Sequence, residues 1–273
     1  MKTIPFVKSV GAGNDFVIVD NRRGAITRSA ARLATLARQL CHRQQGIGAD
    51  GLLVVEESPT QGDFRMRIFN PDGSEPTMCV NGARCLALFA HARRLARPSM
   101  AFSTGAGLIR ASVNGGRVRL GVTQPHGWRA VKHLPVAGRP ATGYSLNTGV
   151  PHIVFFLSAL ARVDVARWGR AIRTHRLFQP TGTNVNFAKV IDRHHLQLRT
   201  YERGVEAETL ACGTGSVASA IAASRIARAE PPVWVRTTGG ETLEVDWRGR
   251  GDHITDVTLA GPARLVYEGR IRI

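Results

Sequence analysis

Apolar residues recur along this chain at two spacings, every second position and every third or fourth position. In residues 64–69, Phe64, Met66 and Ile68 alternate with arginines, as expected for a half-buried strand. The same pattern predicts strands at residues 4–10, 16–20, 52–56, 64–69, 101–104, 108–113, 117–122, 153–157, 185–190, 196–201, 233–236, 242–247, 254–259 and 264–273.

Three segments have helical spacing. Residues 29–42 place leucines on one face, which is typical of a helix packed on a core. Residues 82–96 and 213–227 are apolar around most of their circumference, and the second carries no charge before Arg225. A helix that is apolar all round is buried, so we predict two buried helices.

The two predicted buried helices have the same surroundings in the sequence. Each follows a strand, an acidic loop and one cysteine, Cys79 in the first case and Cys212 in the second. This repeat predicts an internal duplication with an α+β fold. We expect two pseudo-symmetric halves, each a mainly antiparallel sheet wrapped around a central buried helix, with the active site in the cleft between them.

The boundaries of these halves are predicted at residues 1–123 and 124–263, and the terminal strand 264–273 is a candidate to complete the first half. Both lengths fall within the usual range of domain sizes. Residues 124–143 carry several prolines and glycines, and we expect them to form the crossover between the halves.

Cys79 and Cys212 each stand at the start of a small-residue turn that opens a helix. The first helical turn has unpaired N–H groups and a partial positive charge, which lowers a thiol pKa and attracts a carboxylate. We expect one thiolate to remove an α-proton and the opposite thiol to return one. The N–H groups that would hold the substrate carboxylate belong to Val80, Asn81, Gly82, Gly213, Thr214 and Gly215.

A free cysteine is often simply a small buried apolar residue. We interpret Cys41 and Cys85 in that way, whereas the duplicated setting favours catalysis for Cys79 and Cys212. No C-x-x-C spacing or other metal-ligand pattern is present in the sequence, so we expect no metal. No lysine lies in a motif for a Schiff base with pyridoxal phosphate, so we expect no cofactor.

Composition excludes several other classes. The chain has 273 residues, 43% hydrophobic content and a net charge of +17, due mainly to scattered arginines. Without a clustered or aromatic-interleaved basic run, nucleic-acid binding is not favoured. The longest apolar stretch, residues 153–161, is too short to cross a membrane, and no secretory signal is visible. We therefore expect a cytoplasmic protein with reduced cysteines.

Eight segments together identify a resemblance. They are Gly11–Phe16 (GAGNDF), Gly46–Gly51 (GIGADG), Phe69–Glu75 (FNPDGSE), Cys79–Cys85 (CVNGARC), Pro151–His152, Gly182–Asn186 (GTNVN), Tyr201–Gly204 (YERG) and Glu208–Gly215 (ETLACGTG). In content and order, over nearly the whole chain, they resemble the diaminopimelate epimerases, a family of cofactor-independent two-cysteine enzymes.

The resemblance implies epimerisation of LL-diaminopimelate to the meso form, with Cys79 and Cys212 as the acid/base pair. It also implies a homodimer and a small amino-acid substrate contacted by Asn14, Asn70, Asn184, Glu202 and Arg203. The physical chemistry agrees, because the distal amino-acid group needs a cation for its carboxylate and a charge or acceptors for its ammonium. His152 is expected to support the site rather than to act as a base, because the cysteines fill that role.

Two positions depart from the family pattern. Val80 replaces the usual glycine and would be strained if its φ angle had to be positive. Val150 replaces a frequent asparagine and removes one polar contact. Two alternatives therefore stay open: a racemase of another amino acid, such as histidine or proline, and a basic nucleic-acid-binding protein without activity. The charged Glu202 and Arg203 argue against proline.

Overall fold

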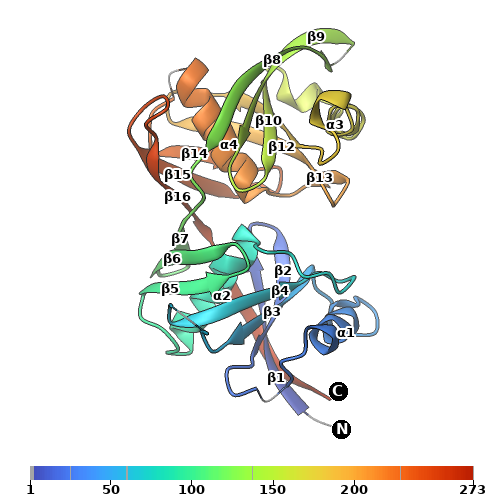
Figure 1. The fold of residues 1–273 in the computed structure, drawn as a ribbon, viewed down its shortest axis with the longest axis vertical. Helices are drawn as coiled ribbons and strands as arrows, with labels where there is room; N and C mark the ends of the chain where they lie inside the picture. Colours follow the sequence, from blue (N-terminus) through green and yellow to red (C-terminus); the bar gives the residue numbers. More distant parts are fainter. Residues whose placement is uncertain (1–2, 25, 60, 137, 228, 273) are drawn as a thin grey trace. The chain divides into compact units, whose positions relative to one another are not determined.

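The computed structural model describes residues 3–272 except 25, 60, 137 and 228. It divides into two compact units. Unit 1 runs to Leu120 and resumes at Gly261, and unit 2 is the continuous stretch Gly121–Ala260. Figure 1 shows both units in the colours of the sequence.

Unit 1 is a sheet with two helices. Its elements are β1 (Thr3–Gly11), β2 (Asn14–Asp20), α1 (Ala30–Cys41), β3 (Gly51–Glu56), β4 (Phe64–Phe69), α2 (Val80–Ala92), β5 (Ser99–Thr104), β6 (Gly107–Asn114), β7 (Arg117–Gly121, at the boundary) and β17 (Arg264–Arg272). From β1 to β7 the successive pairings are antiparallel, parallel, antiparallel, parallel, antiparallel and antiparallel.

Unit 2 has a similar set of elements. They are β8 (His126–Val136), β9 (Arg139–Asn147), β10 (Pro151–Phe156), the 3-10 helix η1 (Leu160–Arg162), α3 (Val165–Arg173), the 3-10 helix η2 (Arg176–Phe178), β11 (Asn184–Val190), β12 (His195–Glu202), β13 (Ala207–Thr209), α4 (Gly213–Ile226), β14 (Val233–Arg236), β15 (Thr242–Arg248) and β16 (Thr255–Pro262, which continues into unit 1).

The two units have the same topology. The series β9, β10, β11, β12, β14, β15, β16 repeats the pairing directions of β1 to β7 without exception. In each series one helix, α1 or α3, joins the first parallel pair, and a second, α2 or α4, joins the second. The predicted fold class, an α+β fold in two pseudo-symmetric halves, is confirmed.

The two helices that follow the cysteines are the most buried in their units. Ten of the 13 residues of α2 and ten of the 14 residues of α4 are buried. Helix α2 packs against β1, β2 and β6, and α4 packs against β10, β11 and β15 (Figure 1). Because their surfaces are apolar nearly all round, burial on several sides is their stable arrangement.

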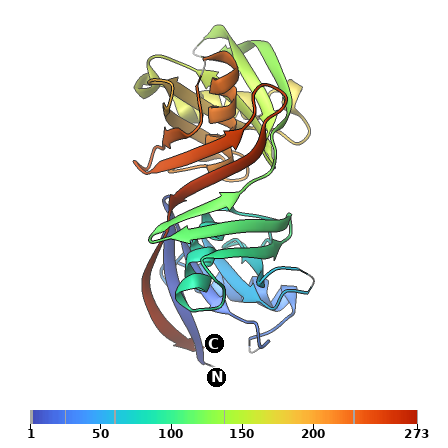
Figure 2. The ribbon, with the colours of Figure 1, turned by 90° about the vertical axis from the view of Figure 1, so that its left-hand side faces the viewer.

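Unit 1 is completed by β17, which pairs with β1 in antiparallel register from Thr3↔Arg272 to Val10↔Arg264. Figure 2 shows β17 in dark red beside β1 in blue. The predicted strand at residues 264–273 is therefore present, and its last residue, Ile273, lies outside the described residues.

The predicted crossover at residues 124–143 is wrong. Strands β8 and β9 form an antiparallel hairpin, and β9 also pairs with β10 inside unit 2. Leu134 and Val136 bury their side chains there, and Gly138 turns the chain with φ +71°. The prolines and glycines of this segment thus mark a hairpin whose outer strand is mostly exposed.

Candidate active site

Cys79 lies at the start of α2 in unit 1. It is the N-cap residue, with an extended backbone (φ −140°, ψ 116°), and the N–H of Gly82 donates to its Sγ over 3.5 Å. The Cys79 side chain is half-buried. The sulfur therefore takes the position that a serine or aspartate oxygen takes at an ordinary helix start.

Cys212 has the same geometry in unit 2. It is the N-cap of α4 (φ −118°, ψ 112°), and the N–H of Gly215 donates to its Sγ over 3.3 Å. The hydroxyl of Thr214 lies 3.5 Å from the same sulfur. A helix N-terminus carries partial positive charge, which attracts a negative group placed there.

The predicted substrate-binding N–H groups divide into two sets. Those of Val80 and Asn81 in α2, and of Gly213 and Thr214 in α4, belong to the first helical turn and have no acceptor within the helix. The N–H of Gly82, in contrast, donates to the sulfur of Cys79 rather than pointing to a substrate. In the same way, the N–H of Gly215 donates to the sulfur of Cys212. Gly82 also allows close packing, because a Cβ there would lie 3.0 Å from Leu53.

Val80 is not strained. It is the first residue of α2 and has a helical backbone, so the positive φ that would have strained a valine does not occur. Its side chain is 9% exposed. The valine therefore differs from glycine here in bulk rather than in backbone conformation.

Two predicted asparagines of unit 1 meet directly. Asn81 Nδ2 donates to Asn14 Oδ1 over 2.7 Å, which joins the first turn of α2 to the start of β2. The third, Asn70, follows β4 and donates from Nδ2 to Ser74 Oγ over 2.9 Å. Asn70 thus belongs to the turn that leads towards Cys79.

Three of the residues expected to contact the substrate lie close together in unit 2. Asn184 accepts from the backbone N–H of Arg203 over 2.8 Å, and Arg203 donates from Nη1 to Thr181 O over 3.1 Å. Burial raises the pKa of Glu202, and the hydroxyl of Thr209, which donates to it over 2.9 Å, opposes that shift. The hydrogen bond connects Glu202 to the strand just before Cys212.

His152 is completely buried at the start of β10. Asn186 Nδ2 lies 3.1 Å from its Nδ1 and also donates to Ile153 O, while Thr200 donates to Asn186 Oδ1 over 3.0 Å. The amide nitrogen is thereby a donor, so His152 Nδ1 accepts and Nε2 carries the proton. Among the described residues, Nε2 has no hydrogen-bond partner.

This environment defines the charge of His152. Burial, with a smaller contribution from the positive charge of Arg203, lowers its pKa to about 3. The imidazole is neutral at pH 7, and its one basic nitrogen already accepts a hydrogen bond. The geometry supports the predicted supporting role, because a histidine in this state has no free lone pair for an α-proton.

Sequence reasoning missed two residues that hold the first turn of α4. A Cβ on Gly215 would lie 2.4 Å from Asn186 Oδ1, so Asn186, which also contacts His152, lies close to the first turn of α4. Thr148 donates to Thr214 O over 3.0 Å. The only available signal was Asn186 in the segment GTNVN, and nothing in the sequence pointed to Thr148.

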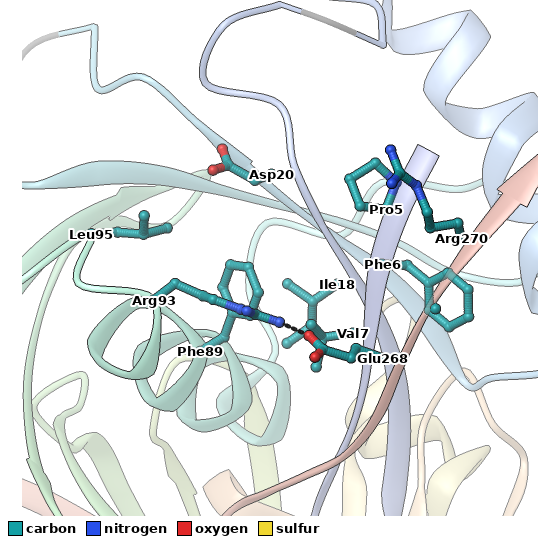
Figure 3. Close-up of a pocket in the computed structure, with 11 residues that line it drawn as sticks. Pro5, Phe6, Val7, Ile18, Asp20, Phe89, Arg93, Leu95, Glu268 and Arg270 are labelled. Atoms are coloured by element: carbon teal, nitrogen blue, oxygen red, sulfur yellow. Dashed lines mark hydrogen bonds and ion pairs between the residues drawn. The ribbon is translucent and has the colours of Figure 1, made fainter. Parts of the chain in front are cut away.

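A pocket of about 570 Å³ in unit 1 contains neither cysteine (Figure 3). An ion pair between Arg93 and Glu268 lies within it, near the C-terminal end of α2 and therefore at the opposite end from Cys79. Its lining is otherwise mostly apolar: Pro5, Phe6, Val7, Ile18, Asp20, Phe89, Leu95, Gly269 and Arg270. None of the predicted site residues is among them, so we do not assign the chemistry to this pocket.

In the part of the chain that the structure describes, no cluster of three or more histidine, cysteine or acidic side chains is arranged to hold a metal ion. In the same residues, no helix is long and apolar enough to cross a membrane.

The fold is shared with solved structures of low sequence identity. A Bacillus anthracis phenazine biosynthesis protein of the PhzF family superposes with a TM-score of 0.70 at 16% identity, covering 100% of both chains. A hydroxyproline epimerase from Agrobacterium vitis gives a TM-score of 0.65 at 13% identity, covering 98% of this chain and 92% of that one. The chain thus shares the fold of these structures, and in this chain α2 and α4 each begin directly after a cysteine.

Sequence comparison defines the family. Residues 6–124 and 144–266 match the family description "Diaminopimelate epimerase". The diaminopimelate epimerase of Aquifex aeolicus is 40% identical over 274 residues, 97% of each chain, and that of Methanocella arvoryzae is 38% identical over 286 residues, 100% of this chain and 98% of that one. The chain belongs to the diaminopimelate epimerase family, and the resemblance found in the sequence is confirmed.

Proposed function

We propose that this protein interconverts LL- and meso-diaminopimelate by a two-thiol mechanism without a cofactor. The observation that carries the proposal is an arrangement that occurs once in each unit. Cys79 and Cys212 each cap a buried helix, and the sulfur of each accepts a hydrogen bond from the backbone N–H of the third helical residue. Family membership, with relatives named as diaminopimelate epimerases over nearly the full chain, supports the same reaction.

The proton balance needs only the two cysteines. One enters as the thiolate and takes the α-proton, so that the Cα–H bond breaks, an S–H bond forms and the electron pair delocalises into the carboxylate. The opposite thiol then gives its proton to the other face of the α-carbon and becomes the thiolate. The proposal requires both sulfurs to approach one α-carbon, and the reverse reaction uses the same groups with their roles exchanged.

The carboxylate next to the reacting carbon becomes more negative as the proton leaves. The N–H groups of Val80, Asn81, Gly213 and Thr214, at the positive ends of two helices, are suited to stabilise that charge. Because their positions are fixed by buried helices, little reorganisation is needed when the charge develops.

The distal end of the substrate would be bound by the polar group of unit 2. Arg203 offers a planar guanidinium for a carboxylate, and Glu202 offers an acceptor for an ammonium. Arg203 is held through its backbone by Asn184, and Glu202 by Thr209. These two charges favour a substrate with a charged distal end over proline, and Val150 is the one position that argues for another amino acid.

The proposal also includes a cellular compartment and an oligomeric state. Free thiols at the catalytic positions are maintained most simply in a reducing cytoplasm, and a homodimer is expected from the family resemblance. Size-exclusion chromatography with light scattering measures the second directly. A monomeric protein that retains full activity would contradict the homodimer.

The test of the reaction is proton NMR of the reduced protein with LL-diaminopimelate in D₂O. We expect loss of the α-proton signal together with appearance of the meso form, both abolished in Cys79→Ser and in Cys212→Ser. Cys41→Ala is the matched control, since it removes a buried thiol that no step uses. Absence of exchange in the wild type, followed by exchange with another amino acid, would replace the proposed substrate.

A further inference from the structure

Four side chains of unit 1 form a continuous line of hydrogen bonds, which we call the amide relay. Arg84 Nη2 donates to Asn81 Oδ1 over 2.8 Å, Asn81 Nδ2 donates to Asn14 Oδ1 over 2.7 Å, and Asn14 Nδ2 donates to Asp50 Oδ2 over 3.0 Å. The relay therefore runs from a guanidinium, through two asparagines, to a carboxylate.

The two ends of the relay determine its direction. A guanidinium can only donate, and an ionised carboxylate can only accept. Asn81 must therefore turn its oxygen towards Arg84 and its nitrogen towards Asn14, and Asn14 must turn its nitrogen towards Asp50. Turning over either amide would place donor against donor at one link and acceptor against acceptor at the other.

The end at Arg84 is held inside unit 1. Its side chain is completely buried, and Asn81 is 5% exposed. Arg84 also donates to Val80 O and to Pro262 O, both over 3.5 Å. A buried guanidinium with these partners has few alternative positions, so it defines the orientation of Asn81 at the first turn of α2.

The end at Asp50 has two distinct sides. Its Oδ2 accepts from Asn14 and from the backbone N–H of Asp15, over 3.0 and 3.2 Å. Its Oδ1 accepts from Arg43, a largely exposed side chain, over 2.7 Å. Arg43 thus contacts Asp50 on the oxygen that does not accept from Asn14, and it also forms an ion pair with Asp15.

We propose that Arg84 and Asp50 are positioning residues that fix which polar atoms Asn14 presents to the substrate. Within the relay Asn14 uses one of its two N–H bonds and one of its two oxygen lone pairs. Its second N–H bond and its second lone pair are left for the substrate, and the relay fixes the directions in which they point. This inference rests on the proposed function, in which Asn14 contacts the substrate. Neither Arg84 nor Asp50 touches the substrate in this account.

The substitution Asp50→Asn tests the inference at the accessible end. A carboxylate accepts on both oxygens, whereas an amide accepts on one only. Whichever way the new amide turns, it presents N–H groups either to Arg43 or to Asn14 and the N–H of Asp15. We expect KM for LL-diaminopimelate to rise about tenfold, with kcat changed less than about threefold, because binding orientation is lost and the thiols are untouched.

Arg43→Met is the matched control. It removes the ion pairs that Arg43 makes with Asp50 Oδ1 and with Asp15, but it deletes neither donor to Asp50 Oδ2, so we expect KM within about twofold of the wild type. An equal rise of KM in both variants would overturn the inference, because it would assign the effect to the loss of an ion pair rather than to the relay.

A second measurement needs no substrate and so separates the relay from the proposed reaction. In protein labelled with ¹⁵N-asparagine, the side-chain signals of Asn14 and Asn81 are assigned from Asn14→Asp and Asn81→Asp. We expect Asp50→Asn to shift both signals, because the polarisation passes along the relay, and Arg43→Met to shift them less. A shift confined to Asn14 would contradict the relay, whatever the enzyme's substrate.

Discussion

The backbone N–H of Gly215 donates to the sulfur of Cys212 over 3.3 Å, so the residue proposed to carry the reactive thiol is also the cap of its own helix. Gly82 and Cys79 repeat the contact at 3.5 Å in the other unit. An ionised sulfur accepts such a bond better than a thiol does. The same contact therefore joins the start of a buried helix to a proposed reactive sulfur in each unit.

The first prediction concerns replacement of either sulfur by oxygen. Serine is a better N-cap than cysteine, so Cys79→Ser and Cys212→Ser should retain the thermal unfolding temperature of the wild type or raise it slightly. Activity should fall by more than about 100-fold, because a serine hydroxyl at this position is far less acidic than a thiol. Calorimetry and the exchange assay measure the two effects separately.

Cys41→Ala is the control for these variants. Burial raises the pKa of the Cys41 thiol to about 12, so that thiol is not ionised at neutral pH. We expect a loss of about 1 kcal/mol of stability or less and unchanged turnover. Loss of activity in Cys41→Ala, with retention in Cys212→Ser, would contradict the assignment of the catalytic thiols.

The second prediction is that Gly215→Ala disturbs the site from within α4. Alanine is the better helix former, but its Cβ would lie 2.4 Å from Asn186 Oδ1 and 3.2 Å from Cys212 Sγ. We expect a destabilisation of about 1 to 3 kcal/mol and a lower kcat. Gly116→Ala is the comparison, since its nearest atom is 3.6 Å away, and it should change neither quantity appreciably.

The third prediction concerns Val80. Because its backbone is helical, Val80→Gly relieves no strain and should cost about 0.5 to 1 kcal/mol through helix propensity, plus the loss of a buried side chain. If the bulk of valine hinders the substrate carboxylate, kcat should rise. Unchanged kcat and KM in this variant would mean that the valine is accommodated without effect on turnover.

The fourth prediction is a pH dependence of stability that originates at His152. Its pKa of about 3 in the folded state lies below the ordinary value of 6.5, so between these values the unfolded chain binds more protons. The contribution of neutral His152 to the free energy of unfolding is therefore fully present above pH 6.5. It is lost as the pH falls towards 3, and the loss amounts to at most about 5 kcal/mol.

Urea unfolding from pH 4.5 to pH 7.5 measures this effect as the difference between the wild type and His152→Gln. The variant should lose stability less steeply on acidification. Glu202, whose pKa burial raises, contributes the opposite slope, since its stabilising protonated form is lost as the pH rises, and this contribution is common to both proteins. Parallel pH profiles would show that His152 is protonated at its ordinary pKa.

Much of the fold could be predicted because its signals are local. The apolar circumference of α2 and α4 indicated buried helices, and the cysteine at each helix start is visible in a few consecutive residues. Helix α3 was missed because it is only nine residues long, although its apolar residues Val165, Trp168 and Ile172 have helical spacing. Its position could have been inferred from the duplication, since α3 occupies the place of α1.

Contacts between distant residues could not be predicted in this way. The link from Asn14 to Asp50 spans 36 positions, and that from Thr148 to Thr214 spans 66. Neither follows from periodicity, because each depends on which strands and loops the fold places next to each other. Likewise β8, mostly exposed along its length, showed no alternation from which a strand could be predicted.

The pairing of β1 with β17 has a consequence for the order in which the protein assembles during synthesis. All of unit 2 lies between β1 and β17 in the sequence, so β1 cannot pair with β17 until unit 2 has been synthesised. Until then β1 remains an open sheet edge, the kind of surface that pairs readily with other chains. The unit that is made first is therefore the one that is finished last.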